Sequence, residues 1–181
     1  MKILFVSDIH GSATALDAVL HFFSSLRCDL LCIGGDIINY GPRNGLPDGL
    51  SPRDVADSLN ALSDRIIAVR GNCDSEVDQM LLNFPMMADY ALVADGSRRF
   101  LITHGHKFLD DNKSPWFKAD VIVSGHTHLW DLHRDADGTV HLNTCSPTFP
   151  KQGRQPTFAF YDGSSLSVLN TSGETLSSLA L

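Results

Sequence analysis

The sequence lacks any long apolar run, since no stretch approaches the roughly 20 residues of a membrane-spanning helix. The apolar residues 3–6 follow a single basic side chain, Lys2, and are too few for the core of a signal peptide. Positive charge is also scarce: 14 Lys and Arg stand against 21 Asp and Glu, a formal net charge of -7. These absences argue against a membrane protein and against a partner held by bulk electrostatic attraction, such as duplex nucleic acid.

Cysteine is sparse and shows no paired spacing typical of metal or redox motifs. The four cysteines are Cys28, Cys32, Cys73 and Cys145. In a chain of 181 residues that is not cysteine-dense, we expect them to be reduced thiols in a cytoplasmic protein.

Repeats and low-complexity linkers are absent too. With 43% hydrophobic residues, the chain fits one domain, residues 1–181, which would bury about 70% of its unfolded surface.

The first half of the chain alternates short apolar runs with helical periodicity. Strand, helix and strand at this spacing predict a βαβ unit with parallel strands, whose ligands gather beyond the carboxyl ends of the strands. The predicted elements are strands at residues 2–6, 30–33 and 66–69, and helices at residues 13–25 after the cap Ser12, from Ser51-Pro52 onward, and over residues 75–82.

The second half reads as hairpins joined at Asp-Gly turns. The predicted strands cover residues 90–93 and 99–102, 121–123, 129–133 and 140–142, and 157–161 and 166–169, with a polar loop at 107–115. This pattern predicts a largely antiparallel second half.

Metal-competent side chains follow five of the predicted strands within about three positions. Taken singly, each has an ordinary explanation as a helix cap, a turn residue or a surface histidine. Five such coincidences at the same end of five strands instead predict a metal site. If the backbone stays extended after the first strand, Asp8 and His10 share a face and can chelate one ion. The full set is Asp8, His10, Asp36, Asn72, His104, His126 and His128.

Seven ligands are too many for one ion and suit two ions that share a carboxylate, for which Asp36 is the natural bridge. Imidazole and oxygen ligands without an obligatory thiolate suit manganese, iron, zinc, nickel or cobalt better than a closed structural zinc site. Paired ions clamp the oxygens of an in-line displacement and activate a water. The chemistry predicted is therefore hydrolysis, with phosphate esters as the expected substrates.

Residues 37–51 are rich in Gly, Pro and Asn and directly follow Asp36. Long irregular segments beside a ligand are often functional. Arg43 in this segment would either hold a phosphate or be a solvated surface arginine. Near the end of the chain, Lys151 and Arg154 are expected as solvated surface charge rather than substrate contacts.

The ligand pattern, taken in order, resembles a known family. It comprises Asp8-x-His10, Gly35-Asp36, Gly71-Asn72-Cys73-Asp74, His104-Gly105 and Gly125-His126-x-His128. These motifs span residues 8–128 and are similar to the signature of calcineurin-like metallophosphoesterases, and in particular to small bacterial phosphodiesterases of that superfamily. The resemblance implies a four-layer α/β/β/α sandwich of two mixed sheets with a dimetal centre at the sheet edge.

The resemblance also implies roles for individual residues. One ion would take Asp8, His10, Asp36 and His128, and the other Asp36, Asn72, His104 and His126. A hydroxide between the ions would attack the phosphodiester in line, with manganese as the expected metal and zinc, nickel, iron, cobalt or magnesium as alternatives. Catalytic roles are expected for Asp36, Asn72, Cys73 and Asp74, and substrate contacts for Asn39, Arg43 and Cys73. The alternative for Asn72 and Asp74 is simple capping of the helix that follows.

The sequence departs from the family pattern at three places. Cys73 stands where many members carry a histidine that assists the leaving group, and a thiol is the poorer general acid at neutral pH. Residues 143–146 replace an Asn-Pro-Gly-Ser turn, and Trp130 replaces a proline. We expect a preference for diesters with good leaving groups and an altered substrate pocket around an unaltered metal centre.

Alternatives remain open: a phosphomonoesterase, a structural metal protein, or a catalytically silent scaffold on the same fold, as in a retromer subunit. The filled ligand set favours the enzyme. The expected partner is a small-molecule phosphodiester, with no stable nucleic-acid complex, no membrane, and possible assembly into a homo-oligomer.

Overall fold

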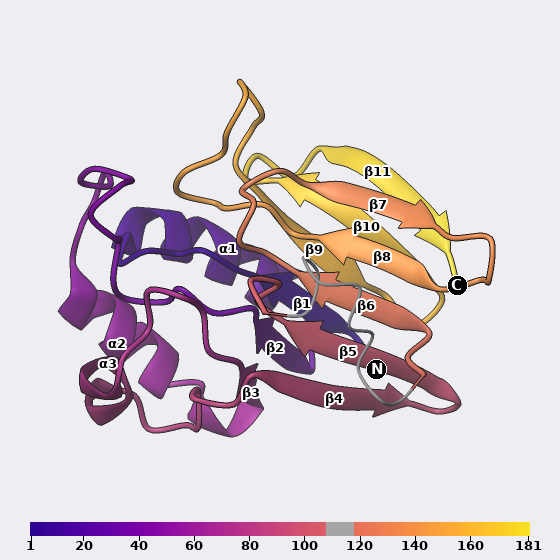
Figure 1. Cartoon of the computed structure of the whole chain (residues 1–181), viewed down its shortest axis with the longest axis horizontal. Helices are drawn as coiled ribbons and strands as arrows, with labels where there is room; N and C mark the ends of the chain where they lie inside the picture. The colour runs from indigo at the N-terminus through magenta and orange to yellow at the C-terminus, as the bar shows by residue number, and fades with distance from the viewer. Residues whose placement is uncertain (108–117) are drawn as a thin grey trace.

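A computed structural model describes residues 1–107 and 118–181 and shows two β-sheets stacked face to face (Figure 1). The strands of the six-stranded sheet, in spatial order, are β11 (Thr175–Ala180), β10 (Ser165–Asn170), β9 (Thr157–Tyr161), β1 (Ile3–Val6), β2 (Leu30–Ile33) and β3 (Ile66–Ala68). Those of the five-stranded sheet are β4 (Tyr90–Asp95), β5 (Arg98–Thr103), β6 (Val121–Ser124), β8 (Val140–Asn143) and β7 (Asp131–Arg134). Both sheets mix parallel and antiparallel pairs.

The helices are α1 (Ala13–Ser25), α2 (Pro52–Asn60) and α3 (Glu76–Leu81), with a short 3-10 turn at Ser63–Arg65. As predicted, Ser12 caps α1, accepting a hydrogen bond from the Ala15 N–H, and Pro52 opens α2. The buried faces of α1 and α2 pack on the outer face of the six-stranded sheet. None of the three helices is long and apolar enough to cross a membrane, in the part of the chain that the structure describes.

A second core fills the space between the sheets. Alternate residues of β1 pack into the two hydrophobic cores. Leu4 and Val6 contact the helices, whereas Ile3 and Phe5 face the other sheet. The Phe5 ring lies 5.8 Å from that of Phe100 on β5. Because both faces of β1 are buried, its sequence is apolar throughout.

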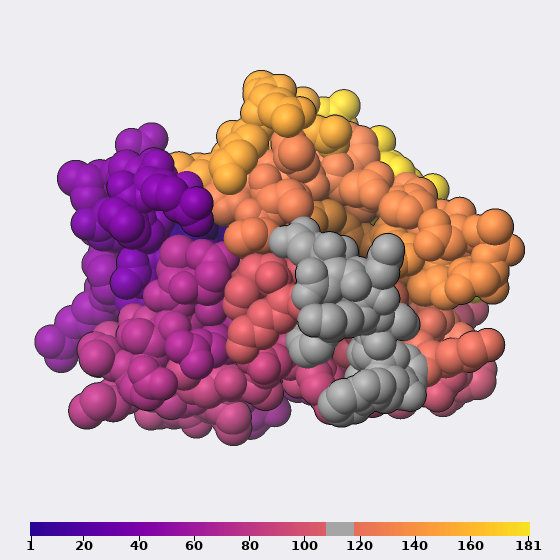
Figure 2. Space-filling model, viewed as in Figure 1, coloured from indigo at the N-terminus to yellow at the C-terminus, as the bar shows by residue number. Residues whose placement is uncertain are grey.

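The predicted α/β sandwich of two mixed sheets is confirmed. The helices of the described ranges lie on the six-stranded side, so the second helical layer of the four-layer arrangement stays a prediction. The space-filling view in Figure 2 shows the indigo-to-magenta residues on one side of the molecule and the orange-to-yellow residues on the other.

The expectation of a largely antiparallel second half is only partly right. The pairs β4–β5, β7–β8 and β9–β10 are antiparallel as predicted, but β6 pairs parallel with both β5 and β8. The edge strand β11 was not predicted, because half of its residues are polar and none of them is buried. Most of the predicted loop at 107–115 lies outside the described residues. The parallel pairing matters for function, since it brings the carboxyl ends of β5 and β6 to the same edge.

Candidate metal centre

The loops after β1 and β2 run side by side. The N–H groups of Asp8 and His10 donate to the carbonyl oxygens of Gly35 and Asp36, at 3.0 and 2.9 Å. Asp8, His10 and Asp36 have φ values of 60°, 53° and 53°, in the left-handed region. The expectation of an extended backbone after the first strand is therefore wrong. Pairing between the two loops, rather than strand alternation, brings these side chains together.

Two glycines allow the loops to approach closely. A Cβ atom at Gly125 would overlap the Ser7 hydroxyl and the Asp8 carboxylate. One at Gly71 would overlap the Asp36 carboxylate in the same way. The Gly125 contact joins loops from the two sheets, and the Gly71 contact joins the loops after β2 and β3, so a larger side chain at either position would displace a carboxylate.

Seven side chains converge at this edge, all from the predicted set. Oδ1 of Asp8 lies 3.2 Å from Nε2 of His128 and 3.6 Å from Nε2 of His10. Oδ2 of Asp36 lies 3.6 Å from Nε2 of His104 and 3.8 Å from Nε2 of His10. These five residues are at most 3% exposed. Such a buried concentration of charge and imidazole is typical of a metal site.

The other two predicted ligands stand beside His104. Oδ1 of Asn72 lies 3.0 Å from Nε2 of His104. The His126 ring lies 5.1 Å from the His104 ring, and the His126 N–H donates to Oδ2 of Asp8 at 2.9 Å. The structure thus brings all seven positions into one cluster.

The hydrogen bonds of three imidazoles test whether the cluster fits a cation. Each Nδ1 lies against a backbone carbonyl oxygen: His10 at 2.8 Å from Asn39, His104 at 2.8 Å from Gly34, and His128 at 2.7 Å from Phe149. A carbonyl only accepts, so each Nδ1 carries the hydrogen and each Nε2 turns a lone pair toward the carboxylates. Oδ1 of Asp8 is buried there with no hydrogen-bond donor. Facing acceptors repel one another unless a cation lies between them, so the residues fit divalent metal ions.

The titration behaviour of the cluster agrees. Burial alone would raise the pKa of the Asp8 carboxyl, but the contacts with His10 and His128 outweigh it and hold that pKa below its usual range. Burial would lower the pKa of His10, but Asp8 and the Asn39 carbonyl raise it on balance. The buried anion thus draws positive charge to the cluster. Because the pKa of His10 is raised, a metal ion at His10 competes with a proton.

Two overlapping groups place their ligand atoms within 4.8 Å of one another: Asp8, His10 and His128, and Asp8, Asp36 and His104. Overlapping groups suit two neighbouring ions. A third group joins Cys73 to His10 and Asp36. Burial and the Asp36 charge raise the pKa of the Cys73 thiol to about 12, so without a bound metal ion the thiol is protonated at neutral pH.

Asp74 lies behind the cluster. Its carboxylate accepts hydrogen bonds from the N–H groups of Asp36, Ile37 and Gly71, at 2.7, 3.0 and 2.7 Å. It is 3% exposed, and burial raises its pKa to about 6 although these bonds favour the ionised form. It does not cap α3, whose N-cap is Ser75. These contacts favour a positioning role for Asp74 over the catalytic role expected from the sequence.

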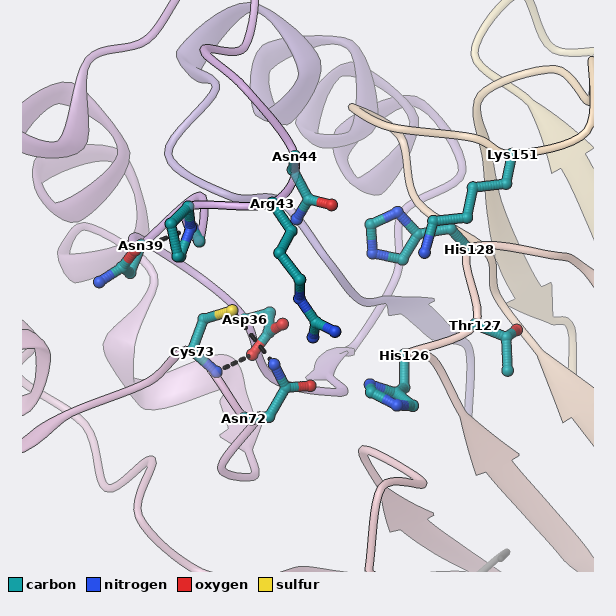
Figure 3. A pocket seen from close by; sticks show the side chains of 12 residues that line it. Asp36, Asn39, Arg43, Asn44, Asn72, Cys73, His126, Thr127, His128 and Lys151 are labelled. Carbon is teal, nitrogen blue, oxygen red and sulfur yellow. Dashed lines mark hydrogen bonds between the residues drawn. The ribbon is translucent and has the colours of Figure 1, made fainter.

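A cavity of about 720 Å³ opens over the cluster (Figure 3). The three predicted substrate contacts, Asn39, Arg43 and Cys73, all line it. The Asn39 side chain, however, accepts a hydrogen bond from the Gly41 N–H at 2.9 Å and so supports its own loop. Arg43 and Cys73 remain the candidates for direct substrate contact.

Both late basic residues, Lys151 and Arg154, are exposed, but only Lys151 lines the cavity. Arg154 stacks over the Trp130 ring, 4.8 Å from its centroid, and is not among the residues that line the cavity. Lys151 is exposed, as expected, and it also lines the cavity. Sequence spacing carries no signal for this, because its place depends on a backbone hydrogen bond from the Lys151 N–H to the His128 carbonyl.

Residues 143–146, which we expected to alter the substrate pocket, instead support the ligand loops. The Asn143 amide donates to the Gly125 carbonyl at 2.7 Å, and the Ser146 hydroxyl donates to the Asp8 carbonyl at 2.7 Å. The Cys145 thiol lies 2.9 Å from the His128 carbonyl oxygen. The segment therefore holds the loops after β1 and β6 in place.

Comparisons with known proteins agree with this geometry. The sequence model of the calcineurin-like phosphoesterase superfamily domain matches residues 1–165. Phosphodiesterase YfcE of Escherichia coli K12 is 43% identical over 176 residues, 97% of this chain and 95% of that protein. The solved structure of E. coli YfcE, described as a phosphoesterase, has a TM-score of 0.93 at 40% identity and covers 99% of both chains.

More distant structures share the fold. Vacuolar protein sorting 29 from Cryptosporidium parvum has a TM-score of 0.66 at 16% identity, covering 99% of this chain and 98% of that one. At this identity the match speaks for the architecture alone. Because the family model matches residues 1–165 and YfcE is 43% identical over nearly the whole chain, this chain belongs to the calcineurin-like phosphoesterase superfamily.

Proposed function

We propose that the chain is a dimetal-dependent phosphodiesterase acting on small phosphodiesters. One observation carries the proposal: Oδ1 of Asp8, buried and without a hydrogen-bond donor, faces Nε2 of His10 and of His128, beside an open cavity that Asp36 and His128 line. Two divalent ions held there would activate a water and neutralise charge on the phosphate oxygens. The name of the relative, a phosphodiesterase, favours diesters over monoesters.

The chain's own residues supply the placement. We assign Asp8, His10, Asp36 and His128 to one ion, and Asp36, Asn72, His104 and His126 to the other. The backbone carbonyls behind the imidazoles fix the tautomers and raise the basicity of the ligand nitrogens. The guanidinium of Arg43 extends into the cavity (Figure 3), where its planar donors suit two phosphate oxygens. Cys73 lines the wall beside it.

The ligand chemistry also guides the choice of metal. A site with carboxylate, amide and imidazole donors suits manganese, with zinc, nickel, iron, cobalt or magnesium as alternatives. We further propose that the protein is cytoplasmic, because its four cysteines are all unpaired. Neither a stable nucleic-acid complex nor a membrane partner is part of the proposal.

The test is hydrolysis of bis(p-nitrophenyl) phosphate and of p-nitrophenyl phosphate by metal-stripped protein, with each metal added back singly. We expect metal-dependent turnover of the diester, greatest with manganese, and at least about 100-fold less in Asp36→Asn. Asp57→Asn, on the exposed side of α2, is the matched control and should keep its activity.

Two other outcomes would each favour an alternative. Faster turnover of the monoester would indicate a phosphomonoesterase. Stoichiometric metal binding with no turnover of either ester would indicate a silent scaffold on this fold.

A further inference from the structure

The segment that orients His10 also carries a positively charged side chain, that of Arg43. The backbone carbonyl of Asn39 accepts a hydrogen bond from Nδ1 of His10 at 2.8 Å. The side chain of Asn39 accepts another from the Gly41 N–H. A turn follows, in which the Asn44 N–H donates to the Gly41 carbonyl at 3.3 Å, and Arg43 occupies its third position. Arg43 is therefore fixed relative to the first imidazole by a short run of hydrogen-bonded backbone.

The segment that orients His128 is built in the same way. The Phe149 carbonyl accepts from Nδ1 of His128 at 2.7 Å, and the Lys151 N–H returns to the His128 carbonyl at 3.0 Å. The Arg154 N–H then closes a turn on the Lys151 carbonyl at 3.1 Å. Figure 3 shows the Lys151 side chain beside His128, on the far side of the cavity from Cys73.

Neither cation has a carboxylate partner within the two described ranges, 1–107 and 118–181. In a chain of net charge -7, two exposed cations without a carboxylate partner in one cavity offer binding sites for an anion. The charges of two divalent ions, of Asp8, Asp36 and the buried Asp74 carboxylate behind them, of a phosphodiester and of a deprotonated water sum to -1. Arg43 balances this charge as it shifts from the attacking oxygen onto the phosphate in the transition state. Lys151 is then left over.

The other residues that line the cavity limit which phosphodiesters are suitable substrates. The described residues that line the cavity include no Phe, Tyr or Trp, so no such ring there could stack on a nucleobase. The volume of about 720 Å³ exceeds what a single phosphate needs.

We infer that Lys151 is a specificity residue, and that the substrate is a phosphodiester with a second anionic group, such as a phosphate or carboxylate, on one of its alcohols. The inference rests on the proposed function of the same site. Arg43 serves the phosphate that is cleaved, and Lys151 binds the second anion from the opposite wall.

The experiment compares two nitrophenyl diesters that differ only in one arm: p-nitrophenyl ethyl phosphate and p-nitrophenyl 2-phosphonoethyl phosphate, whose C–P bond resists hydrolysis. We expect kcat/KM to be about tenfold or more higher for the anionic arm, as for a hydrogen bond to a charged group. In Lys151→Met the ratio should fall to near one. Lys118→Met, just before the opposite end of β6, removes the same charge and should keep the native ratio.

Equal kcat/KM for both diesters in the native protein would overturn the inference, and so would a preference that survives Lys151→Met. Failure of the proposed function looks different, because neither diester would then be hydrolysed with any metal. In that case the second anion site is tested by titration calorimetry, in which the metal-loaded protein is titrated with ethane-1,2-diphosphonate and with ethylphosphonate. Tighter binding of the diphosphonate, lost in Lys151→Met, would support the second anion site, and equal binding would refute it.

Discussion

Five of the seven clustered side chains belong to residues in the left-handed backbone region: Asp8, His10, Asp36, His126 and His128. Among residues with a Cβ atom, Asp and His enter this region more readily than most, although each such residue stores about 1–3 kcal/mol of strain. The residue types chosen for metal binding thus also tolerate the turns that place them. Sequence reasoning identified the residues but assumed an extended backbone, because alternation carries no signal for a turn at a ligand.

Cys73 offers a test at this scale. Its thiol, with a pKa raised to about 12 by burial and by Asp36, is a weak proton donor to a leaving group at neutral pH. Cys73→His should raise kcat about tenfold or more for diesters with an alkoxide leaving group, relative to nitrophenyl esters. The measurement is kcat over a series of leaving groups, with Cys73→Ser as the control. A histidine variant that gains nothing on poor leaving groups would exclude this explanation.

Asp162 gives a prediction on pH. Its carboxylate accepts from the N–H groups of Ser165 and Ser164, both at 2.7 Å, which hold its pKa below the usual range. A lowered folded-state pKa stabilises the fold above the unfolded value of about 3.9, and this stabilisation is lost as the pH falls through the folded value. Because the group is exposed, Asp162→Ala should cost only about 1 kcal/mol at pH 7.

The check for Asp162 is the urea midpoint of the native and Asp162→Ala proteins at pH 7, 5, 4 and 3. The difference between them should be constant down to about pH 5 and shrink below pH 4. A difference that grows on acidification would contradict the assignment.

At the scale of elements, the strands were predictable and their partners were not. Apolar runs located β1, β2, β3, β5 and β6, and the carboxyl ends of parallel strands were expected to meet. The parallel pairing of β6 with β8 and the loop contacts of residues 143–146 depend on distant parts of the chain. Local patterns cannot specify such contacts, since a hairpin signal gives register only to neighbours.

Ser146 tests the role of this segment. Its hydroxyl donates to the Asp8 carbonyl and accepts from the N–H groups of Thr148 and Phe149, with no exposure to solvent. Ser146→Ala leaves these groups unpaired and should lower the free energy of unfolding by about 2 kcal/mol. Because the Asp8 loop loosens, manganese affinity should also fall by about tenfold.

Urea denaturation and a manganese titration measure the two effects. Ser178→Ala, which removes only the exposed hydroxyl pair with Ser167, should stay within about 0.5 kcal/mol of the native protein and bind metal normally. Native metal affinity in Ser146→Ala would show that the segment does not support the centre.

For the whole molecule, the sandwich serves to bring five strand ends from two sheets to one edge. The sequence alone predicted the α/β class and all seven clustered residues, because buried strands and their polar ends are local patterns. It did not predict that Lys151 lines the cavity or that Ser146 supports Asp8, a residue 138 positions away. Both depend on tertiary contacts that spacing does not encode.

The most direct measurement of dimetal catalysis plots diester turnover against the number of manganese ions bound per chain. Bound metal is counted in the same samples in which hydrolysis of bis(p-nitrophenyl) phosphate is followed. We expect turnover to stay low until more than one ion is bound and to saturate at two, because both ions are needed to clamp the phosphate. Saturation at one ion, or no turnover with two ions bound, would contradict a two-metal phosphodiesterase.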